Sequence, residues 1–200
     1  MTKKWIIFVI VGLCFIYAFM GKETIRNFPN SNTVIVAFGD SLTAGYGAGK
    51  GHSYPDYLSQ LLGKPVINLG LSGELAVQAP ERLKEVLSYQ PYMVLIEFGA
   101  NDFMQQRSTS AAVLAVAQIV DAVQDAGAIA VIVNTGGPGM GDYTKAYQKM
   151  AKEKKAVYVP GILRGIFTKR DLKSDAVHPN AEGYKIVAQR VHKAIAKYVK

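Results

Sequence analysis

Ser41 is the residue of this chain best placed to attack a carbonyl carbon. It follows Gly39 and Asp40 at the end of an apolar run over residues 34–38, and a serine at a sharp strand-to-helix turn projects its hydroxyl beyond the edge of a sheet. Gly39 removes a side chain that would crowd this turn. A serine in this position can also simply cap the following segment, so other residues must decide between the two roles.

Asp175 and His178 can supply the base that a serine nucleophile needs. A serine hydroxyl is a weak nucleophile at neutral pH, and its usual base is a histidine whose tautomer is set by a carboxylate. The two residues lie in an irregular stretch just before Pro179 and Asn180, which open the last predicted helix. We therefore take His178 as the candidate base and Asp175 as its orienting acid, although a D-x-x-H sequence alone could be only a helix entrance.

Gly73 and Asn101 are candidates for stabilising the negative charge that develops on a carbonyl oxygen during attack. A glycine N–H and an asparagine amide are suitable donors if loops at the strand ends aim them inward. Taken alone, each has a common structural role, as a turn glycine or as a capping asparagine. The combination of both with Ser41 favours the catalytic interpretation.

Short apolar runs alternate with longer amphipathic stretches, a rhythm that predicts a β-α-β fold. We expect strands at residues 34–38, 66–69, 93–98, 128–134 and 156–159, and helices at 54–62, 77–88, 111–125, 143–152 and 181–199. Because no strand alternates strictly, all should be buried on both faces. The expected fold is a three-layer α/β/α sandwich with a five-stranded parallel, flavodoxin-like sheet, and its ligands should bind beyond the carboxyl ends of the strands.

Four short blocks of sequence, in this order, resemble the SGNH (GDSL) hydrolase superfamily. They are Gly39-Asp40-Ser41-Leu42-Thr43, Gly73, Gly99-Ala100-Asn101-Asp102 and Asp175-Ala176-Val177-His178. The likeness spans about residues 33–195 and is greatest to the small thioesterase/lysophospholipase/arylesterase branch. It implies that Ser41 is the nucleophile, His178 the base and Asp175 its orienter. It also implies an oxyanion hole formed by the Ser41 and Gly73 N–H groups and the Asn101 amide, with acyl-enzyme chemistry that uses no metal or cofactor.

The expected substrate is a small acyl ester or thioester, of lysophospholipid, acyl-thioester or aryl-ester type. The apolar residues Phe103 and Met104, after the third block, suit an acyl chain. Two alternatives stay open, namely a carbohydrate O-acetyl esterase acting on cell-envelope glycan and a non-catalytic lipid or glycan binding module. Glu97, inside an apolar strand, is expected to be a hydrogen-bonded structural carboxylate. No histidines or carboxylates show metal-ligand spacing on one helix face, so no metal site is predicted.

An unbroken apolar run over residues 5–20, preceded by Lys3 and Lys4, predicts one N-terminal transmembrane helix. Its ~16 residues would span ~24 Å, slightly less than a ~30 Å hydrocarbon core. Because suitable small residues are scarce at a cleavage site, we expect a retained signal-anchor at 1–21, a linker at 22–32 and an extracytoplasmic hydrolase domain at 33–200. Cleavage of the segment would instead release a secreted protein.

Charge is distributed unevenly along the predicted domain. Residues 33–140 carry 5 Lys and Arg against 9 Asp and Glu, whereas residues 141–200 carry 14 against 5. The basic last third could contact anionic lipid, or it could form an ordinary solvated helix face. We do not expect nucleic-acid binding, because no aromatic residues interleave with the lysines in a recognition motif. The oligomeric state is left open.

Overall fold

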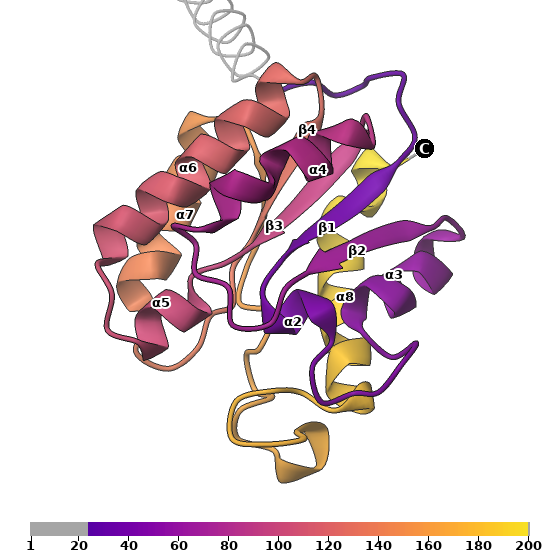
Figure 1. The fold of residues 1–200 in the computed structure, drawn as a ribbon. Coiled ribbons are helices and arrows are strands. Elements are labelled where there is room, and N and C mark those ends of the chain that lie inside the picture. Colours follow the sequence, from indigo (N-terminus) through magenta and orange to yellow (C-terminus); the bar gives the residue numbers. More distant parts are fainter. Residues whose placement is uncertain (1–23, 200) are drawn as a thin grey trace, which may run out of the picture.

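A parallel β-sheet forms the centre of the protein, for which a computed structural model describes residues 24–199 (Figure 1). Its strands are β1 (Ile35–Gly39), β2 (Val66–Gly70), β3 (Met93–Glu97), β4 (Ile129–Val133) and β5 (Val157–Val159). They lie in the order β2-β1-β3-β4-β5, and every neighbouring pair is parallel. This confirms the predicted five-stranded parallel sheet, in the strand order of a flavodoxin-like fold.

Helices cover both faces of the sheet. One face packs on α3 (Tyr54–Leu62) and α8 (Ala181–Ile195), and the other on α4 (Leu83–Ser88), α6 (Thr109–Asp125) and α7 (Gly141–Glu153). Side chains from each strand alternate between the two resulting cores. Capping sets the helix starts, since Ser53 and Asp56 form a capping box for α3, and the Asn180 side chain accepts the Gly183 N–H at the start of α8. The three predicted layers are therefore present.

Several local predictions were wrong for identifiable reasons. β2 lies at an edge of the sheet and is only partly buried, with Asn68 exposed, so burial on both faces does not hold for this strand. Residues 77–88 do not form one helix, because a 3-10 turn (Ala79–Arg82) containing Pro80 precedes α4. The short helices α2 (Ser41–Ala44) and α5 (Ala100–Met104) were not predicted, since neither is long enough to show a helical period.

The candidate residues gather at the carboxyl edge of the sheet. β1 leads into α2, β2 into the turn containing Gly73, and β3 into α5, and the long segment before α8 returns to the same end of the molecule. The chain enters the domain at the opposite edge, where the Arg26 N–H donates to the Lys155 carbonyl, 2.9 Å away, just before β5. The predicted transmembrane segment at 1–21 lies outside the described residues. Within residues 24–199, no helix combines the length and apolarity needed to cross a bilayer.

Candidate active site

Ser41 is the first residue of α2, at the sharp turn that follows β1. The Asp40 side chain caps this helix by accepting the Leu42 N–H at 2.9 Å, and Ser41 itself is only 7% exposed. A β-carbon on Gly39 would lie 2.1 Å from Thr43 Oγ1 and 2.6 Å from the Glu97 carbonyl oxygen. Only glycine therefore fits before this turn, as the sequence suggested.

Ser41, His178 and Asp175 form a continuous chain of hydrogen bonds. Ser41 Oγ lies 3.0 Å from His178 Nε2, and His178 Nδ1 lies 2.7 Å from Asp175 Oδ2. The other carboxylate oxygen of Asp175 accepts the backbone N–H groups of Val177 at 2.8 Å and His178 at 2.7 Å. Partial desolvation acts to raise the pKa of Asp175, but the hydrogen bonds from His178 and Val177 outweigh it and lower that pKa to about 2.

The ionised Asp175 determines which nitrogen of His178 carries the proton. An ionised carboxylate can only accept hydrogen bonds, so Nδ1 must be the protonated nitrogen. The lone pair of Nε2 then faces the Ser41 hydroxyl. In this arrangement a neutral imidazole can accept the serine proton, which is the geometry of general-base activation.

Tyr46 contacts the candidate base and was not singled out from the sequence. Its ring centroid lies 4.6 Å from that of His178 at an interplanar angle of 46°, and the Tyr184 hydroxyl donates to its carbonyl oxygen at 3.0 Å. In the same loop, a β-carbon on Gly47 would lie 1.9 Å from Ser174 Oγ. This close approach packs the 45–51 loop against the segment that carries His178. The only sequence signal was the glycine spacing of that loop.

Asn101 lies beside the nucleophile turn, whereas Gly73 lies in the exposed turn after β2. Asn101 Nδ2 donates to the Glu74 carbonyl oxygen at 3.0 Å and to Asp40 Oδ2 at 3.3 Å, and the residue is 8% exposed. Gly73 has φ +84° and no atom within 4 Å of the β-carbon position. The Asn101–Glu74 hydrogen bond therefore links the turn of Gly73 to the residues around Ser41.

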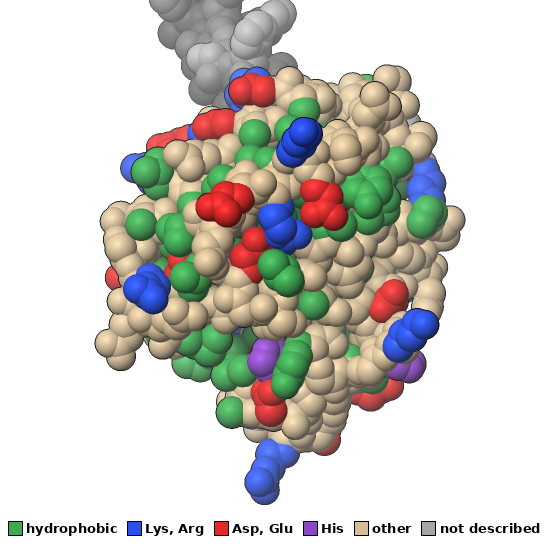
Figure 2. Space-filling view, in the orientation of Figure 1, with side chains coloured by type: hydrophobic (Ala, Val, Ile, Leu, Met, Phe, Trp, Pro, Cys, Tyr) green, Lys and Arg blue, Asp and Glu red, His purple; other side chains and the backbone are tan. Residues whose placement is uncertain are grey.

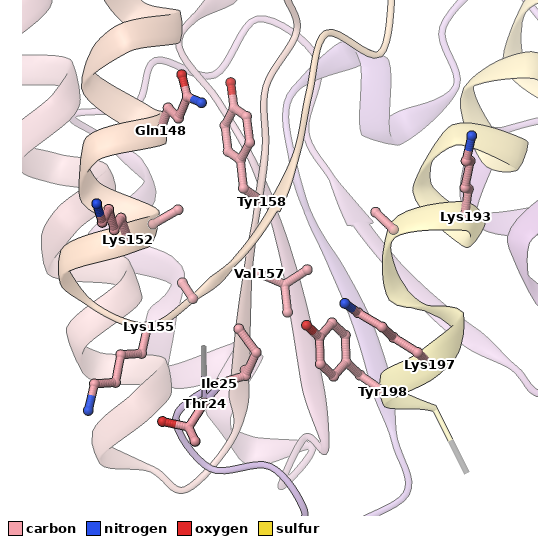
Figure 3. A pocket seen from close by; sticks show the side chains of 13 residues that line it. Thr24, Ile25, Gln148, Lys152, Lys155, Val157, Tyr158, Lys193, Lys197 and Tyr198 are labelled. Carbon is pink, nitrogen blue, oxygen red and sulfur yellow. The ribbon is translucent and has the colours of Figure 1, made fainter. Parts of the chain in front are cut away.

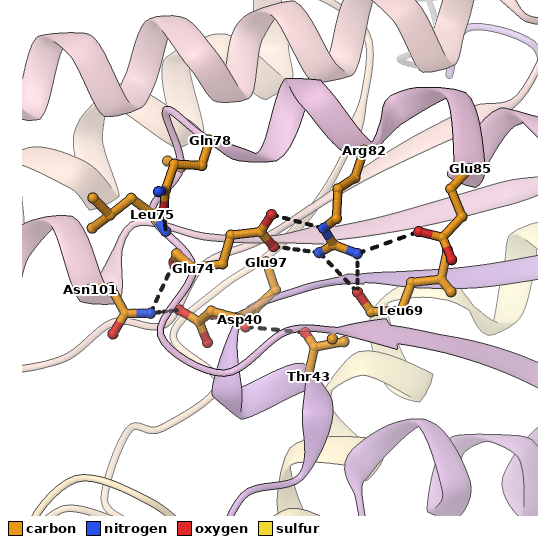
Figure 4. A network of polar contacts seen from close by, with 12 residues as sticks. Asp40, Thr43, Leu69, Glu74, Leu75, Gln78, Arg82, Glu85, Glu97 and Asn101 are labelled. Carbon is orange, nitrogen blue, oxygen red and sulfur yellow. Dashed lines mark hydrogen bonds and ion pairs between the residues drawn. The ribbon is translucent and has the colours of Figure 1, made fainter.

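The carboxyl groups of Asp40 and Glu97 are both fully buried next to the turn that carries Ser41 (Figure 4). Glu97 is fully buried, and its two oxygens accept hydrogen bonds from Thr43 Oγ1 and Thr135 Oγ1, each at 3.1 Å. Burial raises the pKa of Glu97, and burial together with the neighbouring Glu97 charge raises the pKa of Asp40 well above its usual range. The hydrogen bonding expected of the Glu97 carboxyl group is confirmed. In both carboxyl groups the shift favours the protonated form more than it is favoured in water.

An ion pair between the buried Glu74 and the partly buried Arg82 holds the turn after β2. Glu74 is 5% exposed, and both of its carboxylate oxygens accept hydrogen bonds from the Arg82 guanidinium. Arg82 also donates to the Leu69 carbonyl oxygen at 3.2 Å and lies 4.7 Å above the centroid of the Phe38 ring. This pair fixes the Glu74 carbonyl that accepts from Asn101. The pairing with Arg82 had no sequence signal, since the two residues are eight positions apart across an irregular turn.

An apolar pocket of about 260 Å³ opens beside Ser41 and His178. Its large apolar side chains come from α5 and the later loops, namely Phe103, Met104, Met140, Leu163 and Phe167. In the space-filling view, apolar side chains gather beside a histidine near the lower end of the molecule (Figure 2). Across residues 24–199, no three histidine, cysteine or carboxylate side chains are gathered as a metal site. The site therefore combines a nucleophile–base pair with space for an apolar group.

Known proteins are similar to this chain over most of the domain. The sequence model of the GDSL-like Lipase/Acylhydrolase family matches residues 37–186. An arylesterase of Vibrio mimicus is 27% identical over 178 residues, which cover 82% of this chain and 89% of that protein. Thioesterase 1/protease 1/lysophospholipase L1 of Escherichia coli strain K12 is 27% identical over 175 residues, covering 82% and 84%.

Solved structures share the fold as well. The psychrotrophic esterase EstA from Pseudoalteromonas sp. aligns with a TM-score of 0.75 and 25% identity, over 84% of this chain and 98% of that chain. The matched region of the family model includes all the candidate site residues from Ser41 to His178.

Proposed function

The chain belongs to the GDSL-like lipase/acylhydrolase family, and from this premise we propose that it cleaves small acyl esters or thioesters through an acyl-enzyme on Ser41. Membership of the family makes it a serine hydrolase of esterase/thioesterase type. The proposed acyl-enzyme reaction on Ser41 is supported above all by one observation. The Ser41–His178–Asp175 chain of hydrogen bonds opens onto the apolar pocket. The proposal assigns the nucleophile, the base and the orienting acid to these three residues.

In the first step His178 Nε2 accepts the Ser41 proton as Oγ attacks the carbonyl carbon. The resulting imidazolium is stabilised by the ionised Asp175 at 2.7 Å. His178 then returns this proton to the departing alcohol or thiol, which leaves the acyl group on Ser41. Water attacks the acyl-enzyme with the same histidine as base, and the acid is released.

Charge on the carbonyl oxygen is stabilised by the Ser41 and Gly73 N–H groups and by the Asn101 amide. Both amide hydrogens of Asn101 have acceptors in the free protein, and the contact to Asp40 at 3.3 Å is the longer one. Because burial and Glu97 favour the protonated form of Asp40, this acceptor is weak. We expect the corresponding hydrogen of Asn101 to turn to the oxyanion when one forms.

The acyl chain occupies the apolar pocket beside Ser41. Its volume of about 260 Å³ is just below the ~300–1,000 Å³ of clefts that enclose drug-sized ligands, which suits a short or medium chain. A wall of phenylalanine, methionine and leucine side chains favours methylene groups over a bare acetyl group. The names of the Vibrio and Escherichia relatives, an arylesterase and a thioesterase/lysophospholipase, fit the same substrate class.

Active-site labelling followed by a substrate panel tests this proposal. The purified full chain and its Ser41→Ala variant are treated with a fluorophosphonate probe and mapped by mass spectrometry. We expect adduct on Ser41 alone in the native protein, and folded but unlabelled Ser41→Ala protein without turnover. Hydrolysis of acetyl, butyryl and octanoyl esters and thioesters then defines the acyl preference. Unlabelled native protein would refute the role of Ser41, and a preference for acetyl alone would support the O-acetyl esterase alternative instead.

A further inference from the structure

A groove of about 800 Å³ follows the outer edge of β5 between the C-terminal ends of α7 and α8 (Figure 3). Four lysines stand along its walls: Lys152 and Lys155 on the α7 side, and Lys193 and Lys197 on the α8 side. We call this feature the basic groove. A second hollow of about 390 Å³ adjoins it, shares Lys193, and adds Arg164 and Arg190. No acidic residue lines either hollow in the described chain.

The four groove lysines are exposed and without acidic partners. Among residues 24–199, no carboxylate oxygen lies within 4.0 Å of any of their ammonium groups. Other lysines of the same region are paired, since Lys149 lies 3.8 Å from Glu153 and Lys154 lies 2.6 Å from Asp121. The four groove lysines therefore keep positive charges that no described carboxylate within 4.0 Å offsets.

The groove is apolar between its charged walls. Its floor includes Ile25, Val157 and the ring of Tyr158, and lysine stems add further methylene surface. At the same edge Phe28 is 39% exposed, and its ring centroid lies 5.3 Å from that of Tyr198. Such a surface suits a ligand that carries negative charge beside apolar groups.

The basic groove lies where the chain enters the domain. Thr24 and Ile25 line it, and the apolar run of residues 5–20 precedes them by only three residues. A fully extended chain from residue 20 to residue 24 spans at most ~14 Å. With the apolar run in a bilayer, the groove would lie within reach of the lipid headgroups.

We propose that the basic groove docks on the anionic phospholipid headgroups of the membrane that holds the N-terminal segment. The lysines contact lipid phosphates, and the exposed apolar residues at the same edge meet the interface. Each lysine near such a surface strengthens the contact roughly fivefold, so removing two should weaken it about 30-fold. The docked domain turns the β5 side of the sheet, near the amino ends of the strands, toward the bilayer and keeps Ser41, at the carboxyl ends, away from it.

Lysine footprinting of the full chain in vesicles tests the proposal without relying on hydrolysis. The protein is reconstituted in phosphatidylcholine vesicles, with or without about one-third phosphatidylglycerol to supply the anionic surface. A membrane-impermeant acetylating reagent is added, and the labelling rate of each lysine is followed by mass spectrometry. We expect the groove lysines to label severalfold more slowly in the anionic vesicles, and high salt to abolish this difference. Lys50 and Lys169, at the catalytic edge, should label equally in both.

Matched double variants sharpen the test. Lys193→Gln/Lys197→Gln should abolish the protection of Lys152 and Lys155, whereas Lys145→Gln/Lys149→Gln, with the same loss of charge outside the groove, should preserve it. Equal labelling of the groove lysines in both kinds of vesicle would overturn the proposal. It would also fail if inorganic phosphate gave the same protection in phosphatidylcholine vesicles, since that result assigns the groove to a soluble phosphate ligand. Protection of Lys50 and Lys169 instead would place the catalytic edge on the membrane.

Discussion

Gly137 offers a direct way to test where the acyl chain lies. It lines the apolar pocket, and its φ is not in the left-handed region, so a larger residue can adopt its backbone conformation. A β-carbon there would lie 3.3 Å from Met140 Sδ and 3.4 Å from the Phe167 ring. In a Gly137→Leu variant the remaining three side-chain carbons would therefore extend among the residues that line the pocket.

The size of the effect follows from the methylene groups that the new side chain displaces. Each buried methylene contributes ~0.8 kcal/mol, so the loss of three costs ~2.4 kcal/mol, or about 60-fold in kcat/KM. We expect a loss of this size for p-nitrophenyl octanoate and less than about twofold for the acetate, which does not reach the displaced space. In the native protein, kcat/KM should rise about fourfold for each added methylene until the pocket is full.

Gly141→Leu is the matched control for this experiment. Gly141 is the first residue of α7, has no atom within 4 Å of its β-carbon position, and does not line the pocket. Both variants are compared with the native protein by thermal unfolding and by steady-state kinetics on esters of increasing length. An equal loss of kcat/KM for the acetate and octanoate esters would indicate damage to the Ser41–His178–Asp175 triad. Unchanged octanoate hydrolysis in folded Gly137→Leu protein would show that the chain binds elsewhere.

Three further variants test the hydrogen-bond network. Asp175→Asn should keep the backbone contacts of the loop but lose the charge that sets the His178 tautomer, which should lower kcat about 10⁴-fold in ester hydrolysis with little change in Tm. Glu97→Gln removes a buried group whose folded-state pKa is raised. The native protein should therefore lose stability relative to this variant as pH rises above about 4, by up to ~1.4 kcal/mol per pH unit in urea unfolding, and a constant difference would refute the assignment. Arg82→Met leaves the buried Glu74 carboxylate unpaired and should cost about 3 kcal/mol of unfolding free energy, most of it regained by adding Glu74→Gln.

The layout of the site could be predicted because it follows from the topology of parallel strands and from short spacings in the sequence. Parallel strands bring their carboxyl ends to one edge, so residues that directly follow β1 and β3 had to lie at the same edge of the sheet. Asp175 and His178 are close in sequence, and the end of the long segment before α8 brings them to Ser41. Apolar runs and capping residues located the sheet and most of the helices for the same local reason.

The features that escaped prediction depend on tertiary contacts that the sequence pattern does not encode. The exposure of β2 follows from its position at the edge of the sheet, and an apolar run does not encode strand order. The contact of Tyr46 with His178 requires two loops to meet in three dimensions, and the pairing of Arg82 with Glu74 depends on how the turn after β2 leads into the 3-10 helix. Such loops carry no periodic pattern, so only the folded structure reveals which residues hold the catalytic groups in place.

The docking proposal and the proposed function together restrict the choice of substrate, because the basic groove and the acyl pocket lie toward opposite ends of the strands. With the basic groove on the bilayer, the mouth of the acyl pocket faces water at the other end of the strands. A two-chain phospholipid of the same membrane would then have to leave the bilayer completely, at a cost of ~0.8 kcal/mol for every methylene exposed. A single-chain ester or thioester carries about half of that cost and can reach Ser41 from solution. If the domain docks in this way, the proposed reaction should favour soluble acyl thioesters and lysophospholipids over intact membrane lipids.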